Sequence, residues 1–351
     1  MKIAMLAASG SIHTVRWSRG LTSRGHEIML VSNSASSQSP PGITARILPG
    51  RSSLAYFWNI PAVRRIIRKF GPDIVHAHYA TGYGLWGAGQ HTAPLIVSVW
   101  GTDVAEALAG RFMIAPIVRR ALRAARAVTA TSEFLKEQTI LLEPSVASKI
   151  FHVPFGLPRD DSMRHVDRAD GEVRIIFAKQ YLATYGPDLA LKAFAAAFDE
   201  NEHIRLLMLG GGPMREELQR LAASLSIESV VDVRDWTEPE ETRRLIAQSD
   251  IMIMPSRQES FGVAALEAAA AGIPVIAADV GGLSEIIRHE QNGLLVPHDD
   301  VNALAAAIIK LAGDPTLRNR MGEAGLIIAR GEYSMDHCLD LMEAIYAQAA
   351  D

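Results

Sequence analysis

Residues 251–267 read IMIMPSRQESFGVAALE and join two different patterns. The first four residues are a continuous apolar run bounded by Pro255, which is typical of a short buried strand. From Gly262 onward the chain is rich in alanine and leucine and predicts a helix that ends near Ala271. A buried strand that leads through one loop directly into a helix is characteristic of a parallel α/β sheet.

The same alternation of strand and helix extends in both directions from this stretch. Each half of the chain therefore predicts a doubly wound parallel sheet with helices on its faces. The expected strands are 2–8, 27–32, 43–48, 73–77, 94–99, 127–131, 173–178, 204–209, 230–233, 251–254 and 274–278. The expected helices are 14–24, 61–70, 115–126, 189–198, 214–225, 238–248, 262–271, 284–289, 301–312 and 335–349.

The length and one irregular segment predict where the domains divide. At roughly 100–200 residues per domain, 351 residues suggest two domains. The segment 154–170 contains Pro154, Gly156, Pro158 and a polar run, and a new series of strands begins after it. We therefore expect Rossmann-like domains at 1–157 and 158–334, with a final helix in 335–351 that crosses back to the first domain.

The net charge of −4 conceals an asymmetry between the two halves. Residues 1–157 hold 17 basic and 7 acidic residues, for +10, whereas the remainder holds 18 basic and 32 acidic residues, for −14. Such a split indicates that the first half faces an anionic partner, the alternative being an uneven spread of solvated surface charge.

Several classes of protein are disfavoured by the composition. Cys338 is the single cysteine, so neither a disulfide framework nor a cysteine metal site is expected. His76 and His78 form only a His-x-His pair, which predicts packing rather than metal binding. The apolar start of the chain is short and fits a first strand rather than a signal peptide, and no apolar run is long enough to span a membrane. We expect a cytoplasmic protein that does not bind nucleic acid.

Glu259 and Glu267 are the candidate functional residues of the opening stretch. They lie on either side of a helix start, where free backbone N–H groups favour an anion, and Gly262 allows a ligand to approach the backbone closely. Ligands of such sheets bind at the carboxyl ends of the strands. A carboxylate can accept two hydroxyl hydrogen bonds, as from a ribose diol. The alternative is that Glu259 caps the helix and Glu267 is solvated.

This stretch resembles the Glu-x7-Glu signature of the family 4 (GT4) glycosyltransferases, enzymes of the GT-B fold. Further motifs of both halves are similar to the same family, so the resemblance covers nearly the whole chain. These motifs are RGHEI at 24–28, DIVHAH at 73–78, WGTD at 100–103, PFG at 154–156, GGGP at 210–213, AGIPVIAADVGG at 271–282 and NGLLV at 292–296.

The resemblance implies a retaining enzyme that transfers a hexose-type sugar from a nucleotide-diphosphate donor, a UDP- or GDP-sugar. It implies that Glu259 contacts the donor sugar, that Lys179 neutralises phosphate charge, and that Glu267 binds the ribose. Trp236 would border the base, and no metal or other cofactor is expected. The other implied donor contacts are Gly10 and Ser11 from the first domain, and Gly210, Gly211, Ser260, Phe261, Gly262 and Val263 from the second.

Two positions depart from the family pattern. Thr184 stands where a second phosphate-binding cation is usual, and Trp100 stands where a histidine is common. His13 and Asp103 are candidate substitutes for sugar or acceptor contacts. These departures leave open a non-catalytic nucleotide-sugar-binding protein as a rival function. A second rival is another enzyme class on the same fold, a nucleotide-sugar epimerase or a phosphorylase.

The acceptor is expected to be a hydroxyl of a glycan, a lipid-linked molecule or a small molecule. Aromatic residues at 54–58 precede basic residues at 64–69, and a second basic segment covers 111–126. Aromatic and basic residues together favour peripheral attachment to an anionic membrane, here the inner face. The alternative is two amphipathic helices with ordinary solvated faces.

Overall fold

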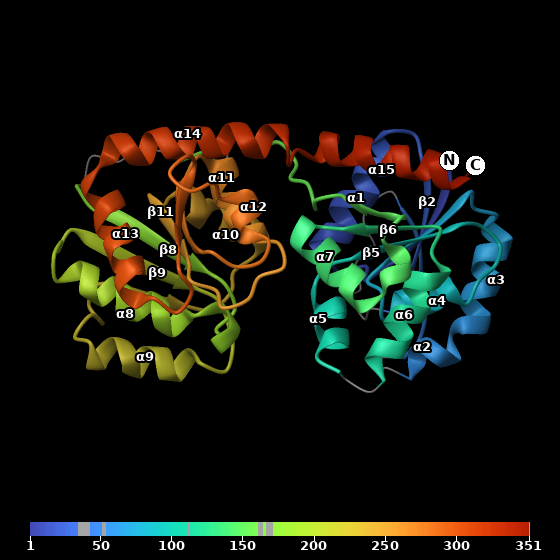
Figure 1. Cartoon of the computed structure of the whole chain (residues 1–351), viewed down its shortest axis with the longest axis horizontal. Helices are drawn as coiled ribbons and strands as arrows, with labels where there is room; N and C mark the ends of the chain where they lie inside the picture. The colour runs from blue at the N-terminus through green and yellow to red at the C-terminus, as the bar shows by residue number, and fades with distance from the viewer. Residues whose placement is uncertain (34–42, 51–53, 111–112, 161–163, 166–170, 351) are drawn as a thin grey trace. The chain divides into compact units, whose positions relative to one another are not determined.

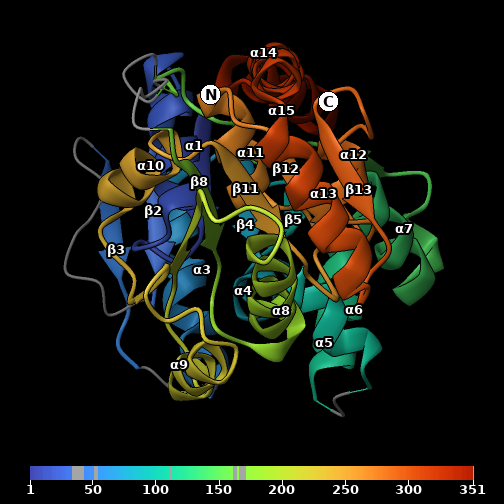
Figure 2. The ribbon, with the colours of Figure 1, turned by 90° about the vertical axis from the view of Figure 1, so that its left-hand side faces the viewer.

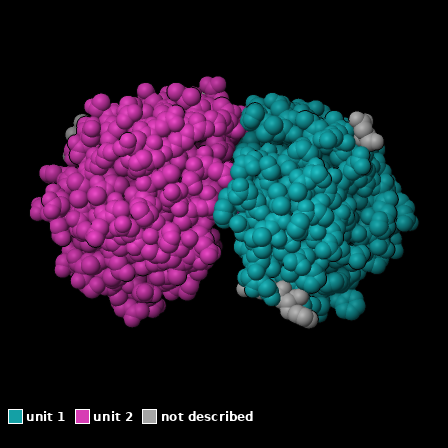
Figure 3. Space-filling model, in the orientation of Figure 1, with its two compact units in different colours: residues 1–158, 335–351 teal, residues 159–334 magenta. Residues whose placement is uncertain are grey.

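The computed structural model describes residues 1–33, 43–50, 54–110, 113–160, 164–165 and 171–350. The chain separates into two compact units, which Figure 3 colours differently. Unit 1 comprises Met1–Pro158 and Met335–Asp351, and unit 2 comprises Arg159–Ser334. The first boundary thus falls one residue later than the sequence boundary. The predicted Arg111 and Phe112 of the second basic segment lie outside the described residues.

Unit 1 is built on a seven-stranded parallel sheet with the order β3-β2-β1-β4-β5-β6-β7. Its strands are β1 (Lys2–Leu6), β2 (Glu27–Ser32), β3 (Thr44–Ile47), β4 (Ile74–His78), β5 (Leu95–Val99), β6 (Ala127–Ala130) and β7 (Ile150–His152). The helices, labelled in Figure 1, are α1 (Ile12–Ser23), α2 (Ala55–Trp58), α3 (Ile60–Phe70), α4 (Gly82–Ala88), α5 (Thr102–Leu108), α6 (Ile114–Ala124), α7 (Glu133–Leu142) and α15 (Met335–Ala350). One core joins α3, α4 and α6 to the sheet, and another joins α1 and α15 to it.

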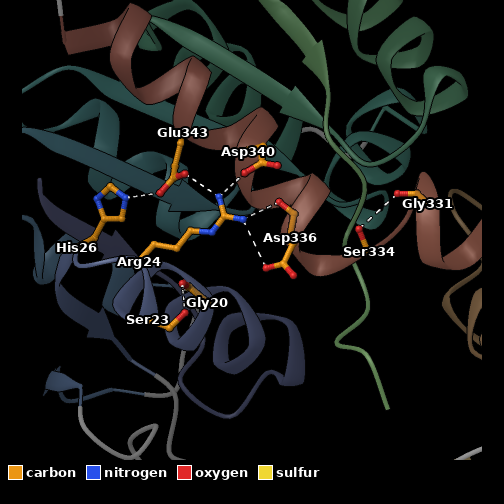
Figure 4. A network of polar contacts seen from close by, with 9 residues as sticks. All are labelled: Gly20, Ser23, Arg24, His26, Gly331, Ser334, Asp336, Asp340 and Glu343. Atoms are coloured by element: carbon orange, nitrogen blue, oxygen red, sulfur yellow. Dashed lines mark hydrogen bonds and ion pairs between the residues drawn. The ribbon is translucent and has the colours of Figure 1, made fainter. Parts of the chain in front are cut away.

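The last helix of the chain is fixed to unit 1 by one arginine (Figure 4). Arg24 Nη1 lies 2.5 Å from Asp340 and 2.8 Å from Glu343, and Nη2 donates to the Asp336 carbonyl at 2.9 Å. His26 Nε2 lies 2.7 Å from the same Glu343. Beneath these polar contacts α15 buries Leu339, Met342 and Tyr346 against unit 1.

Unit 2 is built on a six-stranded parallel sheet with the order β10-β9-β8-β11-β12-β13, part of which faces the reader in Figure 2. Its strands are β8 (Val173–Ala178), β9 (Ile204–Leu209), β10 (Val231–Arg234), β11 (Ile251–Met254), β12 (Val275–Ala278) and β13 (Gly293–Val296). Its helices are α8 (Pro187–Phe198), α9 (Arg215–Ser224), α10 (Pro239–Ala247), α11 (Val263–Ala271), α12 (Leu283–Ile286), α13 (Val301–Gly313) and α14 (Pro315–Gly331). The two doubly wound parallel sheets confirm the α/β class predicted from the sequence.

The element boundaries differ from the sequence prediction where side chains intervene. The helix expected at 284–289 ends at Ile286 because the side chain of Asn292 takes over its C-terminal hydrogen bonds. Asn292 Oδ1 accepts from the Arg288 N–H at 2.6 Å, and its amide donates to the Ile286 carbonyl at 2.9 Å. The sequence prediction also lacked α14, whose first turn is capped by the side chain of Asp314. Among the described residues, no helix has the length and apolarity to cross a bilayer.

Candidate active site

The strand order of unit 2 reverses between β8 and β11, and this switch point fixes where a ligand would bind. In open α/β sheets, ligands occupy the crevice outside the carboxyl ends of the strands at such a reversal. Lys179 directly follows β8, and the loop that carries Glu259 directly follows β11. Two residues 80 positions apart in the sequence are thus brought to one edge of the sheet.

Lys179 and Glu259 form a close ion pair at this edge. Lys179 Nζ lies 2.5 Å from Glu259 Oε2, and the two side chains are 17% and 9% exposed. Oε2 is buried and accepts no hydrogen bond of ordinary geometry, so its contact with Lys179 is an ion pair rather than an aligned hydrogen bond. The ammonium group also lies 4.6 Å from the ring centroid of Tyr185. A cation and a carboxylate are therefore held together in a largely desolvated position.

The backbone around Glu259 is fixed by the loop that follows β12. The Gly282 N–H donates to the Glu259 carbonyl at 3.1 Å. Gly262 has φ +104°, a conformation that a residue with a Cβ rarely adopts, and α11 begins immediately after it. The N–H groups of the first turn of α11 have no partner within the helix, so this end favours an anion. Of the predicted contacts, Val263 is the first residue of α11, Gly262 is its N-cap, and Ser260 and Phe261 lie in the loop just before it.

Glu267 lies further along α11. Its neighbours Leu266, Ala268 and Ala269 are buried, whereas Glu267 itself is half-buried. A half-buried carboxylate remains accessible to a ligand without the cost of a fully buried charge.

The glycine loop after β9 contacts the end of β8. A Cβ on Gly210 would lie 2.0 Å from the Lys179 carbonyl, so only glycine allows this approach. A Cβ on Gly211 would lie 3.4 Å from the indole of Trp236, which follows β10 and is 45% exposed. The predicted residues Lys179, Gly210, Gly211 and Trp236 are therefore neighbours along three adjacent strand ends.

Arg257 is a structural component of the site to which the sequence reasoning assigned no role. Its N–H donates to the Thr184 carbonyl at 2.8 Å, and its guanidinium donates to Ala183, Asp188 and Asp299 at 2.5, 3.1 and 2.7 Å. These hydrogen bonds raise the pKa of the Arg257 guanidinium, chiefly through Asp188. Asp188 and Asp299 are 69 and 42 residues away, so no local spacing pointed to the cluster. Arg257 joins the loop after β8 to the loop after β11.

In unit 1, the predicted residues lie at the carboxyl ends of its own strands. Gly10 and Ser11 form the turn between β1 and α1, and Ser11 immediately precedes the helix. His13 stacks on Phe155 with ring centroids 4.0 Å apart and meets the edge of Trp100 at 5.7 Å. Burial, aided by nearby Arg16, lowers the pKa of His13 to about 4, so its imidazole is neutral at pH 7.

Asp103 corrects the expectation of a direct ligand contact. Its side chain is completely buried, and its oxygens accept from the N–H groups of Ala80 at 2.8 Å, Gly101 at 3.0 Å and Trp100 at 3.2 Å. Burial raises the pKa of the Asp103 carboxyl. Tyr79, which precedes the donor Ala80, has φ +80°, which is uncommon for a bulky residue. Asp103 thus holds the loops after β4 and β5 together and exposes no surface to a ligand.

His76 and His78 are packed side chains within unit 1. His76 Nδ1 lies 2.7 Å from the Tyr346 hydroxyl, and Nε2 lies 2.7 Å from Ser98 Oγ. Burial lowers the pKa of His76 to about 3. In the part of the chain that the structure describes, no group of three or more His, Cys, Asp or Glu side chains is arranged to hold a metal ion.

Comparison with known proteins defines the class of this chain as a glycosyltransferase. Residues 158–326 match the family model described as "Glycosyl transferases group 1", and residues 2–132 match the model "Glycosyl transferase 4-like". The predicted family is therefore confirmed, and the chain belongs to the GT4 glycosyltransferases.

Relatives of this chain include inositol phosphate glycosyltransferases. The chain is 27% identical over 393 residues to the D-inositol 3-phosphate glycosyltransferase of Actinosynnema mirum, with 98% of this chain and 93% of the relative covered. It is 29% identical over 293 residues to the enzyme of that name from Streptomyces avermitilis, covering 72% of this chain. That alignment spans 60% of the length of the Streptomyces protein.

Solved structures confirm the GT-B fold. The sucrose-phosphate synthase of Thermosynechococcus elongatus has a TM-score of 0.82 at 20% identity and covers 99% of this chain and 98% of its own. The Anabaena protein HepE, solved in complex with UDP-glucose, has a TM-score of 0.80 at 16% identity and covers 99% and 100%. At these identities the likeness establishes the fold alone.

Proposed function

We propose that this glycosyltransferase is a retaining enzyme that uses a nucleotide-diphosphate sugar and that its donor lies at the strand ends of unit 2. The observation that carries the proposal is the Lys179–Glu259 ion pair beside the first turn of α11. Transfer from such a donor separates a diphosphate from an electron-poor sugar ring. Fixed charges and dipoles aimed at that developing charge are usually the largest contribution to catalysis.

Each part of the donor has a matching feature in unit 2. The diphosphate is assigned to Lys179, to the backbone of Phe261, Gly262 and Val263, and to the loop of Gly210 and Gly211. Glu267 accepts from the ribose hydroxyls, and the exposed indole of Trp236 borders the base. Gly10 and Ser11 are proposed as further phosphate contacts from unit 1. The HepE complex with UDP-glucose supports a UDP-hexose as the first donor to test, with GDP-sugars next.

The proposed reaction takes place on one face of the sugar ring. The bond between the anomeric carbon and the diphosphate oxygen breaks, and the acceptor oxygen bonds to the same face of that carbon. The proton of the acceptor hydroxyl passes to the phosphate oxygen that is released, and the leaving group is the nucleoside diphosphate. Glu259 stabilises the positive sugar and Lys179 the negative leaving group. This route needs neither the second carboxylate used by retaining hydrolases nor a metal ion or other cofactor.

The proposed acceptor is a hydroxyl of a glycan, a lipid-linked molecule or a small molecule. The relatives named for D-inositol 3-phosphate make an anionic polyol the first small molecule to test. The excess of basic residues in 1–157 supports an anionic acceptor, because this half carries +10. His13 and Trp100 are the proposed acceptor or sugar contacts of unit 1. A lipid-linked acceptor would place the enzyme at the inner face of a membrane.

Thermal-shift screening against nucleotide sugars, followed by product analysis, tests the proposal. A donor that binds the folded protein raises its melting temperature. The donor that gives the largest shift is then incubated with acceptors, and the anomeric configuration of the product is read by NMR. Retention of configuration supports the proposal, and inversion contradicts it. Isomerised donor without acceptor would instead indicate an epimerase, and binding without turnover across the panel would indicate a binding protein.

A further inference from the structure

Three helices of unit 1 form a basic surface, at one end of which Arg123 Nη2 lies 2.8 Å from Glu143 Oε2. The helices α2, α3 and α6 together carry seven Lys and Arg residues and no Asp or Glu. All seven side chains are exposed, and α2 and α6 both pack against α4. The seven are Arg64, Arg65, Arg68, Lys69, Arg119, Arg120 and Arg123. We call these three helices the basic surface.

Large apolar side chains project from the same helices. Trp58 is 77% exposed and Met113, which precedes α6, is 63% exposed; Leu54 and Phe57 are also exposed. Figure 1 places α2 and the start of α6 at the lower edge of unit 1 in that view. Side chains of this size are usually buried in a soluble domain, so several at one edge indicate an interaction site.

The exposed residues of α2 are held by an aromatic anchor that faces inward. Tyr56 packs against Tyr83 and Trp86 with ring centroids 5.4 and 5.2 Å apart. Trp86 Nε1 donates to the Tyr56 carbonyl at 2.7 Å. Because Tyr56 is fixed in the core, its neighbours Phe57 and Trp58 are displayed outward.

We propose that the basic surface docks unit 1 on an anionic lipid bilayer. Arginine and lysine side chains are attracted to anionic headgroups, and tryptophan and phenylalanine settle at the boundary between headgroups and acyl chains. Nucleic acid shares the attraction to basic residues, but its phosphate backbone gives no apolar layer in which Leu54, Trp58 and Met113 could be buried. The inference concerns a surface separate from the donor residues of unit 2, so it stands or falls independently of the proposed reaction.

Co-sedimentation with vesicles tests the basic surface. The vesicles contain phosphatidylcholine with or without phosphatidylglycerol, and the full chain is used at low and high salt. We expect binding only with phosphatidylglycerol, and loss of binding at high salt. Replacing Arg65, Arg68 and Arg120 by Gln should weaken binding about 100-fold, at about fivefold for each charge. Trp58→Ser should weaken it about tenfold.

Matched variants separate the surface from net charge and from misfolding. Replacing Arg220, Arg320 and Arg330 of unit 2 by Gln removes the same charge and should change binding by about twofold or less. Leu141→Ser, at an exposed position of α7, is the apolar control. Vesicle binding should shift the tryptophan fluorescence of the unchanged protein to the blue, because Trp58 is the most exposed of the five tryptophans. Trp58→Phe should keep the binding but lose most of this shift. Unchanged melting temperatures show that the variants fold.

Three results would overturn the assignment. One is the absence of binding to phosphatidylglycerol vesicles at low salt. Another is equal loss of binding in the basic-surface variant and in the unit 2 control. The third is tighter binding to duplex DNA than to the vesicles, abolished by the same three substitutions, which would assign the surface to nucleic acid. Donor-induced thermal shifts should be unchanged in every variant, which keeps this outcome distinct from failure of the proposed function.

Discussion

The switch points of the two sheets have the same architecture but carry different chemistry. In unit 2, where the strand order reverses between β8 and β11, a charged pair lies at the strand ends, Lys179 with Glu259. In unit 1, where it reverses between β1 and β4, the neighbouring carboxylate of Asp103 is bonded to backbone, and His13 is neutral. The same scaffold thus holds a largely buried ion pair at the strand ends of unit 2 and a neutral imidazole with a backbone-bonded carboxylate at those of unit 1.

The largest expected effect is loss of turnover when the charged pair is broken. Glu259→Gln and Lys179→Met should each lower the transfer rate about 1,000-fold, or about 4 kcal/mol, because each removes charge stabilisation at the reacting centre. Gln258→Ala, one residue before the carboxylate, should stay within about twofold and serves as the control. Steady-state rates with a labelled donor provide the measurement. A Glu259→Gln enzyme with a near-normal rate would remove the distinction between the two switch points.

A large effect on stability is expected at the buried carboxylate of unit 1. Asp103→Ala leaves the N–H groups of Ala80, Trp100 and Gly101 without an acceptor and should lower the free energy of unfolding by about 3 kcal/mol. Urea denaturation measures this loss. The donor affinity of the folded fraction of Asp103→Ala should equal that of the unchanged protein. If Asp103→Ala were stable but failed to use acceptor, Asp103 would be a ligand contact after all.

The neutral histidines of unit 1 predict loss of stability in acid. The pKa of His76 is lowered to about 3 in the folded state, against 6.5 in the unfolded chain. Between pH 3 and pH 6.5 the unfolded chain binds more protons at His76 than the folded protein does. The stability that depends on neutral His76 is therefore fully present above pH 6.5 and is lost as the pH falls. At pH 5 the loss should be about 2 kcal/mol. In His76→Asn the pH dependence of the unfolding free energy should be shallower by this share; an identical slope would show that His76 is protonated in the folded protein.

Glu267 should affect binding rather than chemistry. Glu267→Ala removes the proposed acceptor for the ribose diol and should weaken nucleotide binding about 30-fold, or about 2 kcal/mol. Isothermal titration with the nucleoside diphosphate measures this directly. Glu259→Ala should change that affinity much less. Equal losses of nucleotide affinity in the two variants would contradict the separate roles given to the two carboxylates.

The smallest effect is expected at the loop connection made by Arg257. Arg257→Gln loses the ion pairs with Asp188 and Asp299 but leaves the Lys179–Glu259 pair intact, and should lower kcat/KM about tenfold. Arg257→Lys should recover part of the activity, since one cation can reach one carboxylate but cannot make both contacts. If Arg257→Gln matched the loss in Lys179→Met, Arg257 would itself be the second phosphate-binding cation that Thr184 does not provide.

The sequence predicted best those features that depend on neighbouring residues. The strand at Ile251–Met254, the helix that ends at Ala271 and the parallel arrangement of both sheets follow from local patterns of apolar residues. The expected roles of Glu259 and Lys179 came from the family resemblance, and the structure brings these residues together. The sequence assigned no role to Arg257 and predicted a ligand contact for Asp103, because the contacts that these residues make join loops that follow different strands.

Hydrogen–deuterium exchange on donor binding tests the central claim most directly. The nucleotide sugar with the largest thermal shift is added, and backbone exchange is compared with the free protein. We predict that protection concentrates in residues 259–267, 179–186 and 210–212. Protection confined to other strand ends, with these three segments exchanging as in the free protein, would contradict the assignment of the donor to unit 2.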